Sequence, residues 1–238
     1  PWFFVYSNDI ANTYKNIEAK AEMIGYPLII KPANLGSSIG IEIVHKKDEL
    51  KSALSECAKY DDKLVIEKMV KQLKEINISV MGNSKDAKVS AIEEVMKGDE
   101  FLSFSNKYLG GGKGSKSTKM APTKGSKGMA SASRIVPARL DGKKQEQIEE
   151  YALKSFKALN ASGAVRIDFM IDKEDGSVYV NEINSIPGSL AFYLWKEVGV
   201  DFREECDLLI NNALNVYREK KKKVRSFDTN ILSNYKEN

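Results

Sequence analysis

The chain has 238 residues, of which 42% are hydrophobic and 29% charged, and its formal net charge at pH 7 is +4. This composition is typical of a globular protein in water, and the length allows one large or two small domains. The sequence holds neither an apolar run of the roughly 18 residues that span a membrane nor a recognised RNA or DNA motif, so we expect no membrane or nucleic-acid partner. Cys57 and Cys206 are too few for a disulfide scaffold or a zinc site, which favours a reducing, cytoplasmic location.

Residues 1–71 are predicted to form a small α+β domain. The chain starts at Pro1 without an initiator methionine, so we expect a fragment of a longer protein. Ser7-Asn8-Asp9 are expected to cap a helix that runs to about Gly25. Further along the chain, apolar or alternating stretches predict strands, and helical spacing predicts a second helix. The predicted strands cover 26–32, 41–44 and 64–67, the Gly/Ser loop covers 33–40, and the helix covers 48–60.

Residues 72–238 are predicted to form a larger α+β domain. A segment at about 106–133 is expected to be a lid loop, because its centre is rich in Gly, Lys and Ser and cannot form regular structure. Strands are predicted near 74–82, 87–97 and 100–105, a hairpin over 164–171 and 179–184, and helices over 145–159, 190–198 and 201–223.

The predicted hairpin carries the most informative polar side chains of the chain. Because side chains alternate along a strand, Arg166 and Asp168 share one face of the first strand, and Glu182 and Asn184 share one face of the second. Together they could present hard oxygen ligands of the kind that Mg²⁺ takes beside phosphate, with a fixed cation next to them. An ordinary hairpin with one face in water explains the same pattern, so both interpretations stay open here.

Two further segments of the small domain suit a nucleotide. Lys31 precedes the Gly/Ser loop that contains Ser37 and Ser38, and such a loop can offer hydroxyl and backbone N–H groups to phosphate oxygens. The segment around Glu67 leaves a strand between the two domains and could meet an adenine edge, with Glu75 downstream for the ribose. A plain hairpin turn and an ordinary linker are the alternatives.

Two segments of the large domain add to this pattern. Lys107 lies at the start of the predicted lid, which could bring it to the phosphates on closure. Pro187 and Gly188 lead from the hairpin into a helix, where the Gly188 N–H and Ser189 could bind a carboxylate. A disordered loop and a common Pro-Gly turn with a serine cap are the alternatives.

In this order, these segments resemble the ATP-grasp ligases and, within them, the D-alanine–D-alanine ligase family. The resemblance covers nearly the whole chain. It implies two α+β lobes that sandwich ATP between antiparallel sheets, with the N-terminal substrate domain of the family missing. The matching segments are Leu28-Ile29-Ile30-Lys31-Pro32, Gly36-Ser37-Ser38-Ile39-Gly40, Ile66-Glu67-Lys68, Lys107-Tyr108, Arg166-Ile167-Asp168, Glu182-Ile183-Asn184 and Pro187-Gly188.

The resemblance also implies a role for each matching residue. The amino-acid carboxylate is activated by ATP and joined to a second amine, and Arg166 stabilises the tetrahedral intermediate. Gly188, with Ser189 as the candidate serine, fixes the carboxylate of the second substrate. The remaining roles follow the family motif: Lys31 and Lys107 for the ATP phosphates, Ser37 and Ser38 for the covering loop, Glu67, Lys68 and Val70 for adenine, Glu75 for ribose, and Asp168, Glu182 and Asn184 for two Mg²⁺ ions, with Mn²⁺ as an alternative.

The implied partners are ATP and D-alanine, with a homodimer for the full-length protein. A long basic lid and a short segment after Pro187-Gly188 depart from the family pattern and leave the acceptor open between D-alanine, D-lactate and D-serine. Another carboxylate–amine ligase is therefore the alternative within enzymes. A non-catalytic nucleotide- or nucleic-acid-binding module is the alternative outside them.

Overall fold

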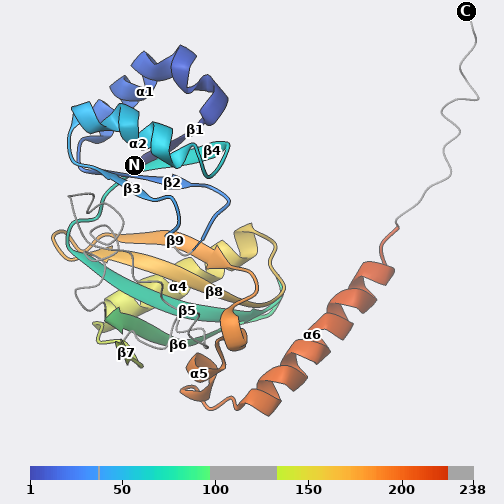
Figure 1. The fold of residues 1–238 in the computed structure, drawn as a ribbon. Coiled ribbons are helices and arrows are strands. Elements are labelled where there is room, and N and C mark those ends of the chain that lie inside the picture. The colour runs from blue at the N-terminus through green and yellow to red at the C-terminus, as the bar shows by residue number, and fades with distance from the viewer. Residues whose placement is uncertain (37, 97–132, 225–238) are drawn as a thin grey trace, which may run out of the picture. The chain divides into compact units, whose positions relative to one another are not determined.

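The computed structural model describes residues 1–36, 38–96 and 133–224, and the chain forms two compact units (Figure 1). The first unit is Pro1–Lys71 and the second is Gln72–Asn238. Each unit is built around its own antiparallel sheet. The sheets and the helices packed on them confirm the predicted α+β class.

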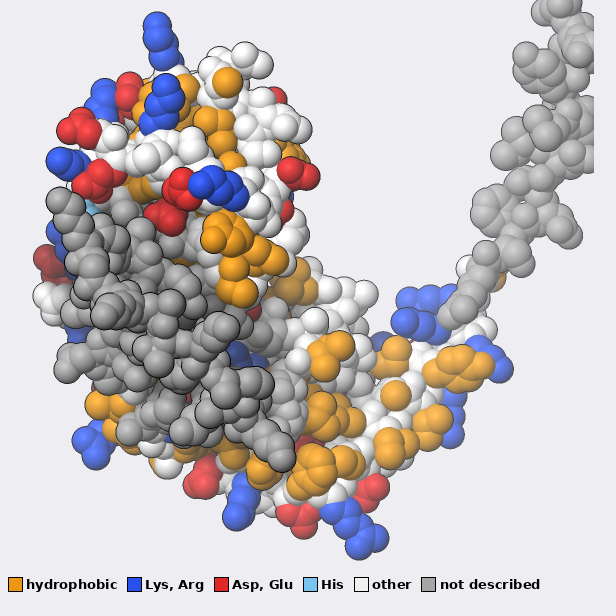
Figure 2. Space-filling model, viewed as in Figure 1, with side chains coloured by type: hydrophobic (Ala, Val, Ile, Leu, Met, Phe, Trp, Pro, Cys, Tyr) orange, Lys and Arg blue, Asp and Glu red, His pale blue; other side chains and the backbone are white. Residues whose placement is uncertain are grey.

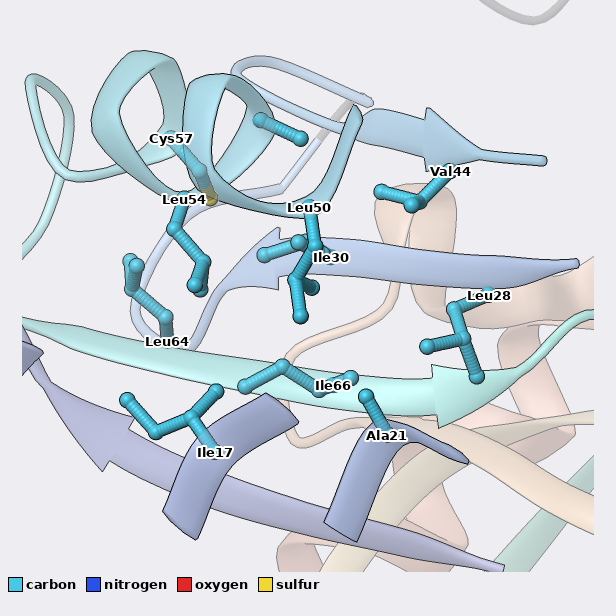
Figure 3. Packing of buried hydrophobic residues seen from close by; sticks show 11 residues of the cluster. Ile17, Ala21, Leu28, Ile30, Val44, Leu50, Leu54, Cys57, Leu64 and Ile66 are labelled. Carbon is cyan, nitrogen blue, oxygen red and sulfur yellow. The ribbon is translucent and has the colours of Figure 1, made fainter. Parts of the chain in front are cut away.

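The sheet of the first unit has the strand order β1-β4-β2-β3. Alternate side chains of β2 and β4 point to the helices and form the core of this unit (Figure 3), where each fully buried aliphatic side chain contributes about 1.5–3 kcal/mol. The elements are β1 (Trp2–Tyr6), α1 (Ile10–Ile24), β2 (Leu28–Pro32), β3 (Glu42–Val44), α2 (Leu50–Cys57) and β4 (Lys63–Lys68). The core residues are Ile17, Ala21, Leu28, Ile30, Val44, Leu50, Ala53, Leu54, Cys57, Leu64 and Ile66.

The sheet of the second unit has the strand order β7-β6-β5-β8-β9. Helix α4 covers one face of this sheet (Figure 1), and its Ile148, Ala152 and Phe156 pack on the apolar residues of the strands. The elements are β5 (Leu73–Gly82), β6 (Ala87–Met96), β7 (Ser133–Ile135), α4 (Gly142–Ala158), β8 (Gly163–Asp172), β9 (Val178–Asn184), α5 (Phe192–Lys196) and α6 (Phe202–Lys221).

Two helix starts differ from the prediction. Residues 7–9 form a short 3₁₀ turn, and Asp9, the N-cap residue that precedes α1, makes no capping hydrogen bond with its side chain. Helix α4 begins earlier than expected, at Gly142, because the Asp141 carboxylate accepts a hydrogen bond from the Lys144 N–H at 2.9 Å.

Three further elements differ from the prediction. The opening residues form β1, whose alternation was hidden because the outward side chains of Trp2, Phe4 and Tyr6 are as apolar as the inward ones. The short strand β7 carries no clear sequence pattern. The helix predicted over 190–198 is only the five-residue α5, preceded by a left-handed turn. The predicted strand at 100–105 lies outside the described residues.

Helix α6 is amphipathic but leaves much of its apolar face exposed (Figure 2). Its N-terminus is capped by Asp201, whose carboxylate accepts from the Glu204 N–H at 2.8 Å. The exposed apolar residues on it are Phe202, Leu208, Ile210, Leu214 and Tyr217. Among the helices of the described ranges, none is long and apolar enough to cross a membrane.

Candidate active site

The polar side chains predicted on the hairpin meet on one face of the second sheet. Along β8, Arg166 and Asp168 alternate with buried residues that pack toward α4. Strand pairing sets Asp168 opposite Glu182 and Arg166 opposite Asn184. Directly opposite residues of antiparallel strands share a face. The hairpin therefore brings its four predicted site residues to one place, on the face away from α4.

A β-bulge at Asn181 makes this arrangement possible. Phe169 pairs with Val180, but the preceding residue Asp168 pairs with Glu182, so β9 contains one extra residue between them. Strict alternation from Val180 would have turned Glu182 toward the core. The bulge turns it to the polar face and returns Ile183 to the core.

Arg166 and Asp168 form a two-point ion pair. The Arg166 Nε lies 2.7 Å from Asp168 Oδ1 and its Nη2 lies 2.8 Å from Oδ2. The Asn184 side-chain amide also donates to Oδ2, at 3.2 Å. The hydrogen bonds to Asp168 raise the pKa of Arg166, with smaller contributions from the charges of Tyr193 and Glu93. The guanidinium is thus a permanent cation, aligned by its neighbours.

A second pair of predicted residues meets in the first unit. The Lys31 Nζ lies 2.9 Å from Glu67 Oε1, and both side chains are largely buried. Trp2 pairs with Glu67 across β1 and β4, so its indole lies on the same sheet face. The two residues predicted for the ATP phosphates and the adenine are therefore neighbours on one surface.

The Gly/Ser loop that follows Lys31 is shaped by Gly40. Its φ of +72° is in the left-handed region, and a Cβ there would lie 2.8 Å from Cδ2 of Tyr60. Ser38 also has a left-handed backbone, with φ of 59°. Ser37 lies outside the described residues. Gly36 has open space around it, so the close packing that requires glycine is at Gly40.

The predicted carboxylate site is a left-handed turn, Gly188–Ala191. Three consecutive residues that are not glycine have positive φ: Ser189 at 53°, Leu190 at 55° and Ala191 at 59°. Each costs roughly 1–2 kcal/mol relative to a right-handed conformation. Strain of this kind persists where the surroundings fix it, and it gathers at binding and catalytic sites.

Comparison with known proteins identifies the family of this fold. Residues 1–211 match the protein family described as D-ala D-ala ligase C-terminus. The chain belongs to this family.

Curated relatives bear the same description. The D-alanine–D-alanine ligase of Thermosipho africanus is 38% identical over 227 residues, which are 95% of this chain and 55% of that protein. The ligase of Thermosipho melanesiensis is 41% identical over 209 residues, 88% of this chain and 52% of that protein. The chain spans about half the length of the curated relatives it matches.

Solved structures of D-Ala ligases have the same fold. The VanG D-Ala:D-Ser ligase from Enterococcus faecalis has a TM-score of 0.67 and 26% identity, and the match covers 89% of this chain and 56% of that one. The D-alanine–D-alanine ligase from Bacillus anthracis complexed with ATP has a TM-score of 0.66 and 26% identity, covering 92% and 62%. The predicted family and the ATP-grasp fold are confirmed.

The other residues predicted from the D-Ala ligase motif lie apart from these pairs or outside the description. The Lys68 ammonium donates to the backbone carbonyls of Gly25 and Tyr26, at 2.8 and 3.1 Å, so its side chain holds the end of α1. Val70 follows β4 in the first unit. Glu75 belongs to β5 of the second unit. Lys107 lies outside the described residues, as does almost all of the predicted lid.

The prediction from sequence missed polar residues on the same face of the second sheet. Asn77 of β5 pairs with Asp168 on one side and with Glu93 of β6 on the other. Arg134 and Tyr193 approach Glu93 from β7 and α5. The available signal was the polar Asn77 between the apolar Ile76 and Ile78.

The oxygen donors on the hairpin fit Mg²⁺. Asp168 and Glu182 supply two carboxylates and Asn184 an amide oxygen, all hard ligands. Within the described ranges, no three His, Cys, Asp or Glu residues gather into a metal site. Mg²⁺ commonly takes one or two protein carboxylates and fills its other positions with water and phosphate oxygens. The donor set therefore suits a metal that arrives with a nucleotide.

Proposed function

We propose that this chain is the nucleotide-binding and catalytic part of an ATP- and Mg²⁺-dependent D-alanine–D-alanine ligase. The observation that carries the proposal is the polar face of β8 and β9, where Arg166 and Asp168 form a two-point pair opposite Asn184 and Glu182. Family membership and the ligase relatives support it. Such a reaction would supply a dipeptide for cell-wall synthesis.

The proposed reaction has two steps. The γ-phosphoryl group of ATP passes to a carboxylate oxygen of the first D-alanine, and ADP leaves. The amine of the second D-alanine then attacks the carbonyl carbon of this acyl phosphate, and inorganic phosphate leaves. Arg166 donates to the oxygen that gains negative charge in the tetrahedral intermediate, where an aligned cation is most effective. A nucleophilic side chain is not needed.

The remaining assignments follow the family motif. Lys31 and Lys107 hold phosphates under the loop with Ser37 and Ser38, Glu67 and Val70 meet the adenine, and Glu75 the ribose. Asp168, Glu182 and Asn184 hold two Mg²⁺ or Mn²⁺ ions, which when bound neutralise charge on the phosphate oxygens. Gly188 and Ser189 bind the carboxylate of the acceptor amino acid. Lys68 also meets the adenine in this proposal, while its side chain holds the end of α1.

The acceptor has a second candidate. The VanG D-Ala:D-Ser ligase is among the similar solved structures, at 26% identity. A D-serine acceptor is therefore the alternative to D-alanine. The family also predicts a homodimer and a cytoplasmic location for the full-length protein.

The test uses the full-length protein with ATP and Mg²⁺ and measures ADP release. We expect D-alanine to stimulate release more than D-serine or D-lactate, with D-alanyl-D-alanine as the product. Asp168→Asn and Glu182→Gln should abolish turnover. Asp172→Asn is the matched control, because Asp172 ends the same strand and its carboxylate accepts only from the adjacent turn, at 2.9 Å from the Glu174 nitrogen.

Three results would contradict the proposal. Release that no D-amino acid stimulates would refute the ligase. Stimulation by D-serine alone would correct the acceptor. A module that binds nucleotides or polyanions without catalysis would bind Mg-ATP equally well after Asp168→Asn, and its binding to polyanions would fall steeply with salt.

A further inference from the structure

A fully buried carboxylate lies on the polar face of the second sheet. Glu93 of β6 is 0% exposed. The Asn77 side-chain amide donates to its Oε1 at 3.0 Å, and Asn77 in turn pairs with Asp168 across β5 and β8. Glu93 is thus two strands away from the Arg166–Asp168 pair, in the same row of side chains.

Two more groups lie beside the Glu93 carboxylate, although neither its Oε2 nor the Tyr193 hydroxyl has a hydrogen-bond partner among the described residues. The Arg134 Nη1 lies 3.7 Å from Glu93 Oε2. The Arg134 guanidinium carbon also lies 5.1 Å from the centre of the Tyr193 ring, a cation–π contact. The Tyr193 hydroxyl is buried, and burial together with the adjacent Glu93 carboxylate raises the pKa of Tyr193. We call Asn77, Glu93, Arg134 and Tyr193 the Glu93 cluster.

Stability alone does not explain the Glu93 cluster. Removing a carboxylate and a guanidinium from water costs several kcal/mol per ion, and well-packed apolar residues often replace a buried ion pair without loss. The opposite face of the same sheet is built in that apolar way, around Ile78 and Ile92. We therefore consider which structural element the charged side chains of the Glu93 cluster hold in place.

The Glu93 cluster holds helix α5. Tyr193 belongs to α5, which packs against β5 and β6. On the same helix, the buried Trp195 Nε1 donates to Ser79 Oγ at 3.0 Å, and Ser79 Oγ donates to the Val165 carbonyl at 2.9 Å. Helix α5 is therefore held to β5 by the Trp195 contact, and Ser79 of β5 continues this contact to β8, the strand that carries Arg166.

Helix α5 directly follows the strained turn Gly188–Ala191. Three left-handed residues in succession need an external restraint, because the chain would relax without one. The contacts between α5 and the sheet supply this restraint on the C-terminal side of the turn.

We propose that Glu93, Arg134 and Tyr193 are positioning residues that hold α5 and thereby fix the Gly188–Ala191 turn for the carboxylate of the acceptor amino acid. This inference rests on the function proposed above. It predicts a selective effect: loss of the Glu93 charge should weaken binding of the acceptor amino acid and leave binding of ATP unchanged. A small misplacement of a substrate-positioning group can lower the reaction rate by up to about a hundredfold.

The first test is kinetic and uses the full-length protein with Glu93→Gln and Tyr193→Phe. We expect the KM of the acceptor amino acid to rise roughly ten- to a hundredfold, while the KM of ATP stays within about twofold. Glu94→Gln is the matched control. Glu94 is the next residue of β6, faces the opposite side, and forms an ion pair of 2.9 Å with Lys74 while only 13% exposed.

The second test needs no activity. The sequence has two tryptophans, Trp2 and Trp195, so Trp2→Phe leaves Trp195 as the only tryptophan of the 238-residue chain, and excitation at the red edge of its absorption avoids tyrosine emission. In that background we expect Glu93→Gln and Tyr193→Phe to make Trp195 more accessible to acrylamide, and Glu94→Gln to leave it protected.

The outcomes separate the two proposals. Unchanged acceptor KM and unchanged quenching in both variants would overturn the positioning role, even if the unfolding temperature fell. A wild-type protein without turnover would refute the proposed function instead, and quenching would then decide whether the cluster fixes α5. If Glu93→Gln does not fold, Tyr193→Phe removes only a hydroxyl and carries the same test.

Discussion

Arg166 and Asp168 lie two residues apart on β8, and two guanidinium nitrogens of Arg166 donate to the two carboxylate oxygens of Asp168, at 2.7 and 2.8 Å. Residues with this spacing on a strand share a face, and here each is also the other's main electrostatic partner. The proposed cation of the reaction and the proposed metal ligand therefore depend on each other's geometry. A substitution at either residue should therefore alter the side-chain geometry of the other.

Replacing Arg166 with lysine tests this dependence. Lysine keeps the charge but cannot reproduce the two-point contact. We expect Arg166→Lys to lower kcat about 10²–10³-fold, as removal of an aligned oxyanion donor does. It should also change the Mg²⁺ concentration needed for half-maximal rate, because Asp168 loses its alignment. Steady-state rates over a Mg²⁺ series measure both. Arg218→Lys on α6 is the control, and equal losses in the two variants would count against the assignment.

Lys31 in the first unit provides a binding test. Removal of a charge-assisted hydrogen bond costs about 1.5–3 kcal/mol, or roughly ten- to a hundredfold in affinity. We expect Lys31→Gln to weaken Mg-ATP binding by this factor. The emission of Trp2 can report the titration, because Trp2 pairs with Glu67, the partner of Lys31.

The control for Lys31 is another lysine of the same sheet. Lys63→Gln removes a cation that lies 4.3 Å from the centre of the Phe4 ring, away from Glu67. It should leave the Mg-ATP affinity within about twofold. Equal weakening by both substitutions would indicate general electrostatic attraction and reject a specific role for Lys31.

The alternation of the sequence predicted half of the polar face and left the other half undetermined. Arg166 and Asp168 stand between buried apolar neighbours, so their shared face follows from a period of two. The face of Glu182 does not follow, because the bulge at Asn181 interrupts the period. Val178 and Ile183 carried the signal, because both pack on the core although an odd number of positions separates them, and strict alternation would put them on opposite faces.

The Glu93 cluster could not be predicted from local patterns. Glu93 precedes Glu94, and the two carboxylates side by side in the sequence suggest an exposed strand end. In the fold Glu93 is fully buried on one face and Glu94 is paired with Lys74 on the other. Only the strand order β7-β6-β5-β8-β9 brings Arg134 and Asn77 to Glu93, and that order pairs strands far apart in the sequence, such as β5 with β8, where Leu73 lies opposite Asp172.

The left-handed turn gives a paired prediction at Ser189. Glycine at this position has no Cβ penalty at a φ of 53°, whereas alanine keeps it. We expect Ser189→Gly to be about 1 kcal/mol more stable than Ser189→Ala toward urea. Both variants lack the hydroxyl, so both should raise the KM of the acceptor. Equal stability would show that the turn relaxes in solution, and an unchanged KM would exclude Ser189 as the carboxylate ligand.

Glu205 on α6 gives a prediction for pH. It is 0% exposed, and among the described residues neither of its carboxylate oxygens has a hydrogen-bond partner. Burial raises the pKa of Glu205 from 4.5 to about 7. Between these values the folded chain binds a proton that the unfolded chain has released. The contribution of Glu205 to the free energy of unfolding therefore falls as the pH rises from 4.5 to 7. Above pH 7 the ionised, buried carboxylate lowers this free energy by a constant amount.

Glu205→Gln removes that cost, because glutamine stays neutral at every pH. We expect it to raise the free energy of unfolding at pH 8 by up to about 3 kcal/mol and to change little at pH 4.5. Urea unfolding at both pH values, followed through Trp195 in the Trp2→Phe background, measures the difference. Glu204→Gln, an exposed neighbour in the same helical turn, should show no such gain at pH 8, because Glu204 is already solvated and lies favourably at the helix N-terminus. A gain for Glu205→Gln that is equal at both pH values would mean better packing and not the release of a buried charge.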